Sequence, residues 1–229
     1  MAGFTTIDTI AFIFFVASWL GYGLAVEQGP HAERSLNARM NIRRARWIQE
    51  SVRRENRIID TQVMNGLQNG TAFFASTSLI AIGGSLALLQ STDRVVAIFA
   101  DLPFTAPTSR AAWEIKVIGL AVIFAHAFFK FAWSYRLFNY CAILLGAIPP
   151  MERREEQETK DAVRETIAMN IAAGRHFNRG QRAFFFALAY LGWFIDPWLF
   201  LAATAAVLTA MWRRQFASES ARIFTSPGH

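Results

Sequence analysis

The longest apolar stretch of the chain, residues 115–148, reads IKVIGLAVIFAHAFFKFAWSYRLFNYCAILLGAI. A helix needs about 20 apolar residues to cross the hydrocarbon of a bilayer, so this stretch exceeds one span but is too short for two spans and a turn. Three further apolar runs cover residues 7–26, 71–90 and 183–211. We therefore predict an all-α, polytopic membrane protein, one membrane domain over residues 1–229, with four transmembrane helices at about 7–26, 71–90, 115–136 and 183–205.

Composition supports this class. Hydrophobic residues make up 53% of the chain and 21 residues are Phe, which is more than an ordinary soluble domain carries. No basic residue precedes the first run, and its only charged residue near the start is Asp8, so that run is expected to be a retained span and not a secretory signal. The single cysteine, Cys141, argues against a disulfide framework or a cysteine-built metal site. His126 is the one histidine in a predicted span, so we predict no haem, no metal and no other cofactor.

Basic residues predict the orientation, because Lys and Arg concentrate in cytoplasmic loops. The loop after the first span carries Arg34, Arg39, Arg43, Arg44, Arg46, Arg53, Arg54 and Arg57, and the loop after the third carries Arg153, Arg154, Lys160, Arg164, Arg175, Arg179 and Arg182. Both loops should be cytoplasmic, so four spans would leave both termini outside. The expected location is the bacterial inner membrane, with Arg213 and Arg214 as the exception to the charge rule.

The two basic loops should be helical, at about residues 35–67 and 155–173, and form an arginine-rich cytoplasmic layer. In the first loop, five arginines recur at helical spacing on one face: Arg39, Arg43, Arg46, Arg53 and Arg57. This face can be solvated, lie on anionic membrane lipids, contact another subunit or line an ion-conducting vestibule. Interleaved acidic residues and the absence of a recognition motif argue against nucleic acid. Asn65-Gly66 and Asn69-Gly70 indicate a bend before the second span, although a continuous helix remains open.

Ionisable groups inside spans are costly, so they are candidate functional residues. The predicted topology places His126, Lys130 and Asp196 at similar depth, and the first two share a helix face. The three can be a polar clasp that holds the helices in register, or a relay or charged constriction for an ion. On the second span, Thr77, Ser78 and Ser85 can form a helix contact or line a pore.

Several strings resemble the bacterial and plant membrane family known as domain of unknown function 599: SLNARM at 35–40, RIIDTQ at 57–62, NGLQNGTAFFASTS at 65–78 with Gly83-Gly84, and KFAWSYR at 130–136. The resemblance covers most of the chain. It implies the four-span arrangement and a joint role for the arginine helix, the second span and the Lys130 segment, but no activity.

Catalytic motifs such as a nucleophile elbow, a Walker loop or HExxH are not found in a suitable context, so an enzyme is not the favoured class. We predict a homo-oligomer that forms or gates a polar pathway for an ion or small solute. The alternative is an accessory or scaffold subunit of a larger membrane complex, without transport or catalytic activity of its own.

Overall fold

A computed structural model describes residues 3–100, 109–219 and 223, and every regular element in these ranges is helical. The main helices are α1 (Thr6–Gln28), α2 (Leu36–Ser51), α3 (Ile58–Gln90), α4 (Thr92–Ala100), α5 (Arg110–Ala147), α6 (Gln157–Leu191) and α7 (Pro197–Phe216). Three short 3₁₀ helices join them: η1 (Ala32–Arg34), η2 (Met151–Arg153) and η3 (Gly192–Phe194). The all-helical fold class is confirmed.

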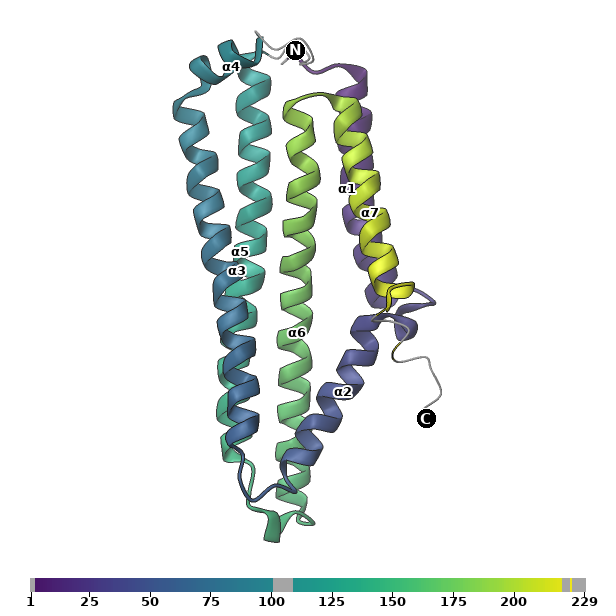
Figure 1. The fold of residues 1–229 in the computed structure, drawn as a ribbon, viewed down its shortest axis with the longest axis vertical. Helices are drawn as coiled ribbons and strands as arrows, with labels where there is room; N and C mark the ends of the chain where they lie inside the picture. Colours follow the sequence, from purple (N-terminus) through teal and green to yellow (C-terminus); the bar gives the residue numbers. More distant parts are fainter. Residues whose placement is uncertain (1–2, 101–108, 220–222, 224–229) are drawn as a thin grey trace.

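Three long helices, α3, α5 and α6, run the full length of the molecule (Figure 1). We call the end that holds α4 and the start of α1 the upper end. Helices α1 and α7 lie side by side along the upper half, and α2 continues along the lower half beside α6 (Figure 1). The 38 residues of α5 extend about 57 Å at 1.5 Å per residue, against about 30 Å of bilayer hydrocarbon. The long helices therefore reach well beyond one membrane thickness.

Three helices are long and apolar enough to cross a membrane: α1, α3 and α5. This supports a membrane protein. Residues 137–148 lengthen the apolar stretch beyond one span, and one face of this segment is buried in a core of the lower half. Leu137, Phe138, Cys141 and Leu145 pack there with Ile48 of α2 and Met64 of α3. The end of α5 is thus apolar because it is packed by protein.

The fourth predicted span, residues 183–205, is not one helix. Helix α6 ends at Leu191 and α7 begins at Pro197, and the chain reverses between them at the upper end (Figure 1). Asp196 is the N-cap of α7 and accepts a hydrogen bond from the amide of Trp198 at 2.7 Å, while Pro197 occupies the first turn, where no amide hydrogen is needed. The prediction of two external termini depends on an uninterrupted span, so it loses its basis.

The predicted helix over residues 35–67 is also wrong. Helix α2 ends at Ser51, and α3 begins at Ile58 and passes through Asn65-Gly66 and Asn69-Gly70 without a break. Open space surrounds both glycines, so neither the packing nor a turn interrupts the helix there. The predicted helix over 155–173 is the first half of α6, and its apolar side, with Val163 and Ile167, contacts the core that Ile48 and Val52 form.

An aromatic core fills the upper half. Phe15 of α1 contacts Phe186 and Tyr190 of α6 and Phe200 of α7, with ring centroids between 5.1 and 5.6 Å apart. Below it, α5 and α6 can approach closely because Gly180 has no side chain. A Cβ at this position would lie 2.9 Å from the ring of Phe131. These contacts fix the spacing of α1, α5, α6 and α7, which carry the polar residues discussed next.

Candidate functional site

The structure does not bring His126, Lys130 and Asp196 together. Asp196 lies at the upper end, where its charge acts on Lys116. Lys130 is 14 residues further along α5, which places it about 21 Å below Lys116. The predicted clasp does not form because the chain reverses direction at Asp196, between α6 and α7.

His126 and Lys130 belong to a different group of side chains. His126 is exposed on α5 and meets Trp19 of α1 edge-on, with ring centroids 5.6 Å apart. The charges of Lys130 and Arg182 act on His126, and the charge of Lys130 also acts on His176 of α6. His126 and Lys130 of α5 therefore lie near Arg182 and His176 of α6.

At the upper end, a buried ion pair joins α1, α5 and the turn before α7. The Lys116 ammonium donates a hydrogen bond to the Trp193 carbonyl oxygen at 2.8 Å and lies 3.9 Å from the Asp8 carboxylate. Asp8 also accepts from Trp193 Nε1 at 2.6 Å and from the Thr5 amide at 2.9 Å. Lys116 is 4% exposed and Asp8 is 6% exposed. We call these residues the upper clasp.

The five arginines predicted to share one face do not. Arg39, Arg43 and Arg46 lie on α2, whereas Arg53 follows its end and forms an exposed pair with Glu50 at 3.2 Å. Arg57 donates to the carbonyl oxygens of Ile148 and Pro149, at 2.8 and 2.9 Å, and so satisfies the end of α5. These hydrogen bonds give Arg57 a structural role at the end of α5.

The helix α2 also carries an arginine that the predicted face omits. Arg44 donates to the Asn170 side chain of α6 at 2.7 Å, and a Cβ at Gly174 would lie 3.1 Å from its guanidinium carbon. Burial lowers the pKa of Arg44 from its usual range. This arginine joins α2 to α6, so α2 packs along α6.

The hydroxyl residues of α3 form a helix contact. Ser78 and Ser85 are buried, and each donates a hydrogen bond to a carbonyl oxygen one turn earlier, in Phe74 and Ala81 respectively, at 2.8 Å. Thr77 is half-buried and donates to Phe73 in the same way. The donor hydrogens of these hydroxyls are therefore satisfied within α3, as expected of hydroxyl residues at a helix contact.

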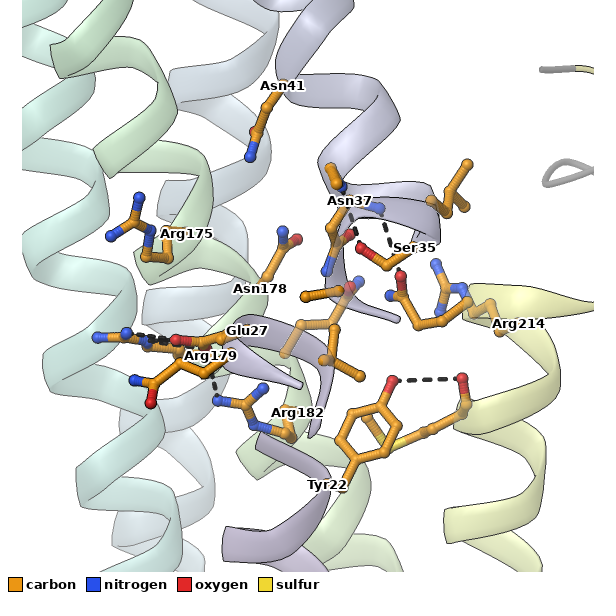
Figure 2. Close-up of a pocket in the computed structure, with 18 of the residues that line it drawn as sticks. Tyr22, Glu27, Ser35, Asn37, Asn41, Arg175, Asn178, Arg179, Arg182 and Arg214 are labelled. Carbon is orange, nitrogen blue, oxygen red and sulfur yellow. Dashed lines mark hydrogen bonds and ion pairs between the residues drawn. The ribbon is translucent and has the colours of Figure 1, made fainter. Parts of the chain in front are cut away.

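A polar pocket of about 450 Å³ lies between the end of α1, the start of α2, the middle of α6 and the end of α7 (Figure 2). We call it the arginine pocket. Four arginines line it: Arg175, Arg179 and Arg182 from α6 and Arg214 from α7. Amide side chains complete the wall: Gln28, Asn37, Asn41, Asn178, Gln181 and Gln215. Since α1 is 23 residues long, about 35 Å, the pocket lies one bilayer thickness from the upper end.

Glu27 occupies one side of the arginine pocket. It accepts hydrogen bonds from Arg179 at 3.0 Å and from Arg182 at 3.0 Å, and Figure 2 shows its carboxylate between the two guanidinium groups. Arg182 can reach across because Gly23 has no side chain, and a Cβ there would lie 3.2 Å from the guanidinium. These contacts tie α1 to α6.

The other two arginines are not neutralised in this way. In the described part of the chain, no carboxylate lies within ion-pair distance of Arg175 or Arg214, and Arg214 rests over the Phe185 ring at 5.8 Å. Planar guanidinium groups bind phosphate and carboxylate groups through paired hydrogen bonds, and nearby amides can bind hydroxyl or carbonyl groups. The arrangement is therefore suited to an anionic ligand.

A metal site does not emerge from the described ranges, where no three His, Cys, Asp or Glu side chains gather as ligands would. The absence of a cofactor stays a prediction.

Comparison with protein families gives a match over residues 10–220 to the family described as "Protein of unknown function, DUF599". The chain belongs to the DUF599 family. Comparison with curated proteins and with solved structures found no match. Membership of DUF599 confirms the resemblance noted from the sequence, and the site must be interpreted from its own chemistry.

The upper clasp and the arginine pocket of this DUF599 chain could be predicted only in part from the sequence. The pattern Thr5-x-x-Asp8 is a helix-capping signal, but it does not reveal that Asp8 also meets Lys116. Arg175, Arg179 and Arg182 occur at spacings of four and three, which places them on one helical face. Because the sequence-based topology treats them as loop residues, the pocket they line remains hidden until α6 is seen as one helix.

Proposed function

We propose that this protein binds small anions in the arginine pocket and gates their passage along a polar route between α1, α5 and α6. The observation that carries the proposal is the convergence of four arginines on one pocket, opposed by Glu27 and Glu33. Helices α6 and α7 together place two guanidinium groups there without an acidic partner in the described ranges. Such a surplus of positive charge attracts anions into a concave site.

The orientation follows from the same charges. The arginine pocket, α2 and the lower half of α6 carry most of the basic residues, so they belong on the cytoplasmic side. The N-terminus is then external, and the end of α7, with Arg213 and Arg214, is cytoplasmic. This arrangement removes the exception to the charge rule that external termini require.

The route above the pocket has basic groups followed by an aromatic barrier. Arg182, His126 and Lys130 lie near one another, and Trp19 contacts both His126 and the Phe186 ring. Phe15, Tyr190 and Phe200 fill the space between this point and the upper clasp. Apolar constrictions close a polar path by excluding water, so the aromatic core is the proposed gate.

The first experiment measures anion binding by the purified protein in detergent, with inorganic phosphate and sulfate as probes. The double variant Arg175→Gln/Arg214→Gln should lose at least tenfold in affinity, because it removes the two unneutralised guanidinium groups. Arg213→Gln is the matched control, since Arg213 neighbours Arg214 but lies outside the pocket. Equal affinities of the double variant and the control would contradict the proposed site.

The second experiment measures phosphate uptake into proteoliposomes. Uptake above that of empty vesicles, reduced by the double variant and raised by Trp19→Ala, is expected if the aromatic core is a gate. Binding without uptake would instead favour an accessory or scaffold protein that recognises an anion.

The accessory alternative has one specific observation in its favour. The upper clasp satisfies the buried charges of α1 and α5 by contacts within the chain, as expected of residues that only hold helices together. The predicted homo-oligomer and the contact of Arg43 and Arg46 with anionic lipid remain part of the proposal. A fixed stoichiometry with a larger membrane enzyme, together with absent anion flux, would select the accessory role.

A further inference from the structure

Helix α3 has a second face that the other described residues leave uncovered. Its inner face carries the buried residues Asp60, Met64, Thr71, Ser78 and Ser85, and α5 is the main helix against which α3 packs. Positions that lie one residue before or two residues after these inner residues are half-buried or exposed, and we call them the outer α3 face: Ile59, Val63, Gly66, Gly70, Phe73, Thr77, Ile80, Gly84 and Ala87. These positions alternate by four and three residues over most of the helix, the repeat by which two helices pack side by side.

Lipid cannot cover the whole of this face. The 33 residues of α3 extend about 50 Å, whereas the hydrocarbon is about 30 Å thick. Polar contacts surround the lower end of α3: Asp60 accepts a hydrogen bond from Trp47 at 2.7 Å and forms an ion pair with Arg54. Ile59 is nevertheless 67% exposed, and Val63, one turn on, is exposed as well. An apolar face that leaves the membrane calls for a protein partner.

Charge indicates which partner. The chain carries a net charge of +6, and its arginines concentrate on α2 and α6, so contacts between copies through those helices would be repulsive. From Thr61 to Gln90, α3 has no charged residue at all. Among the described residues, a Cβ at Gly66, Gly70 or Gly84 would meet no atom within 4 Å, so another helix can approach the backbone closely.

We propose that the outer α3 face is the interface of a two-fold symmetric homodimer. The proposal deepens the homo-oligomer part of the proposed function, but it depends on no residue of the arginine pocket. Both copies have the same orientation in the membrane, so the two-fold axis is normal to the bilayer and the two α3 helices run parallel. In such an interface each residue near the axis faces its own counterpart.

Self-crosslinking tests this geometry directly. Ile80→Cys should form a disulfide-linked dimer in native membranes, while Leu79→Cys should not, although Leu79 is 57% exposed beside Ile80 at 75%. Ile59→Cys and Ile58→Cys provide the same comparison below the membrane, since Ile58 is 61% exposed. The wild-type protein gives the background, because Cys141 is buried. Equal crosslinking of the paired positions would overturn the interface.

A second pair of variants uses adjacent glycines and needs no added cysteine. Gly84→Leu should lower the dimer fraction about tenfold, because a side chain there separates the two helices. Gly83 lies outside the outer α3 face, so Gly83→Leu should leave the dimer fraction unchanged. Mass measurement of the full chain in lipid nanodiscs, without added anion, supplies the readout. A monomer for the wild-type protein would refute the proposal whatever the result of anion binding.

Discussion

The two ends of the molecule hold the same kind of interaction in opposite surroundings. At the upper end, Lys116 and Asp8 are buried, and their charged atoms lie 3.9 Å apart. At the lower end, Arg153 and Glu156 are exposed and approach to 2.6 Å. The shorter pair should nevertheless matter less, because water screens exposed charges and replaces their lost contacts. Burial, and not distance, therefore determines how much each pair contributes to stability.

The arginine pocket lies between these extremes. Glu27 and its partners Arg179 and Arg182 are only partly buried, and the pocket contains more cations than the carboxylate can neutralise. A fully paired cluster such as the upper clasp cannot accept a ligand without losing its own contacts. A cluster with surplus positive charge can bind an anion and keep its own contacts. For this reason we assign ligand binding to the arginine pocket and not to the upper clasp.

The largest effect is expected at the upper clasp. Lys116→Met leaves the Asp8 carboxylate buried without its cationic neighbour and removes the hydrogen bond to the Trp193 carbonyl, which should cost about 3–5 kcal/mol of unfolding free energy. Denaturant unfolding of the purified protein in detergent measures it. Adding Asp8→Asn to Lys116→Met should recover part of the loss, since the side chain becomes neutral.

Lys130→Met is the matched control for that experiment. Lys130 is half-buried on the same helix and has no carboxylate partner among the described residues, so its loss should cost less than about 1 kcal/mol. A double-mutant cycle between Lys130 and Asp196 should give no coupling. Strong coupling in that cycle would restore the clasp that the sequence suggests and contradict the position of Asp196.

The contrast between Lys130 and Lys116 shows what the sequence could reveal. Apolar runs predict the membrane class and the helices, because length and hydrophobicity are local properties. The secondary structure that Asp196-Pro197 adopts is not decided by local sequence. The pair can bend a helix or cap a new one, and the outcome depends on whether α7 finds a partner, which α1 supplies through contacts such as Tyr22 with Met211.

The candidate site was harder to predict than the fold for the same reason. A depth estimate for His126, Lys130 and Asp196 assumes that the fourth apolar run crosses the bilayer once. In the structure the chain reverses within this run, so Asp196 lies at the level of Lys116 and far from Lys130. Arg182 reaches Glu27 past Gly23 on another helix, a contact with no trace in either local sequence.

A smaller effect is expected in the arginine pocket. Glu27→Gln removes the carboxylate between Arg179 and Arg182 and should lower the unfolding free energy by about 1–3 kcal/mol, since hydrogen bonds to charged groups are lost in a partly buried place. Added sulfate should then stabilise the variant more than the wild-type protein, because an anion can take the vacated position. Thermal unfolding with and without sulfate measures both effects.

Glu33→Gln provides a comparison for Glu27→Gln, because Glu33 lines the same pocket but is exposed and accepts no hydrogen bond from the described arginines. It should leave stability unchanged. An equal response of the two variants to sulfate would show that the anion acts on the net charge of the protein and not at the position of Glu27.

The smallest effect is expected at the lower end. The hydrogen bond from Arg153 lowers the pKa of Glu156 below its usual range, so this pair contributes stability above the unfolded-state pKa and loses it as the pH falls through the lowered value. Both side chains are exposed, and solvent screening leaves little to lose. Glu156→Gln should therefore not shift the unfolding temperature measurably at neutral pH or in mild acid. A shift as large as that of Lys116→Met would mean that the lower end is shielded from water, as it would be if a partner covered η2 and the start of α6.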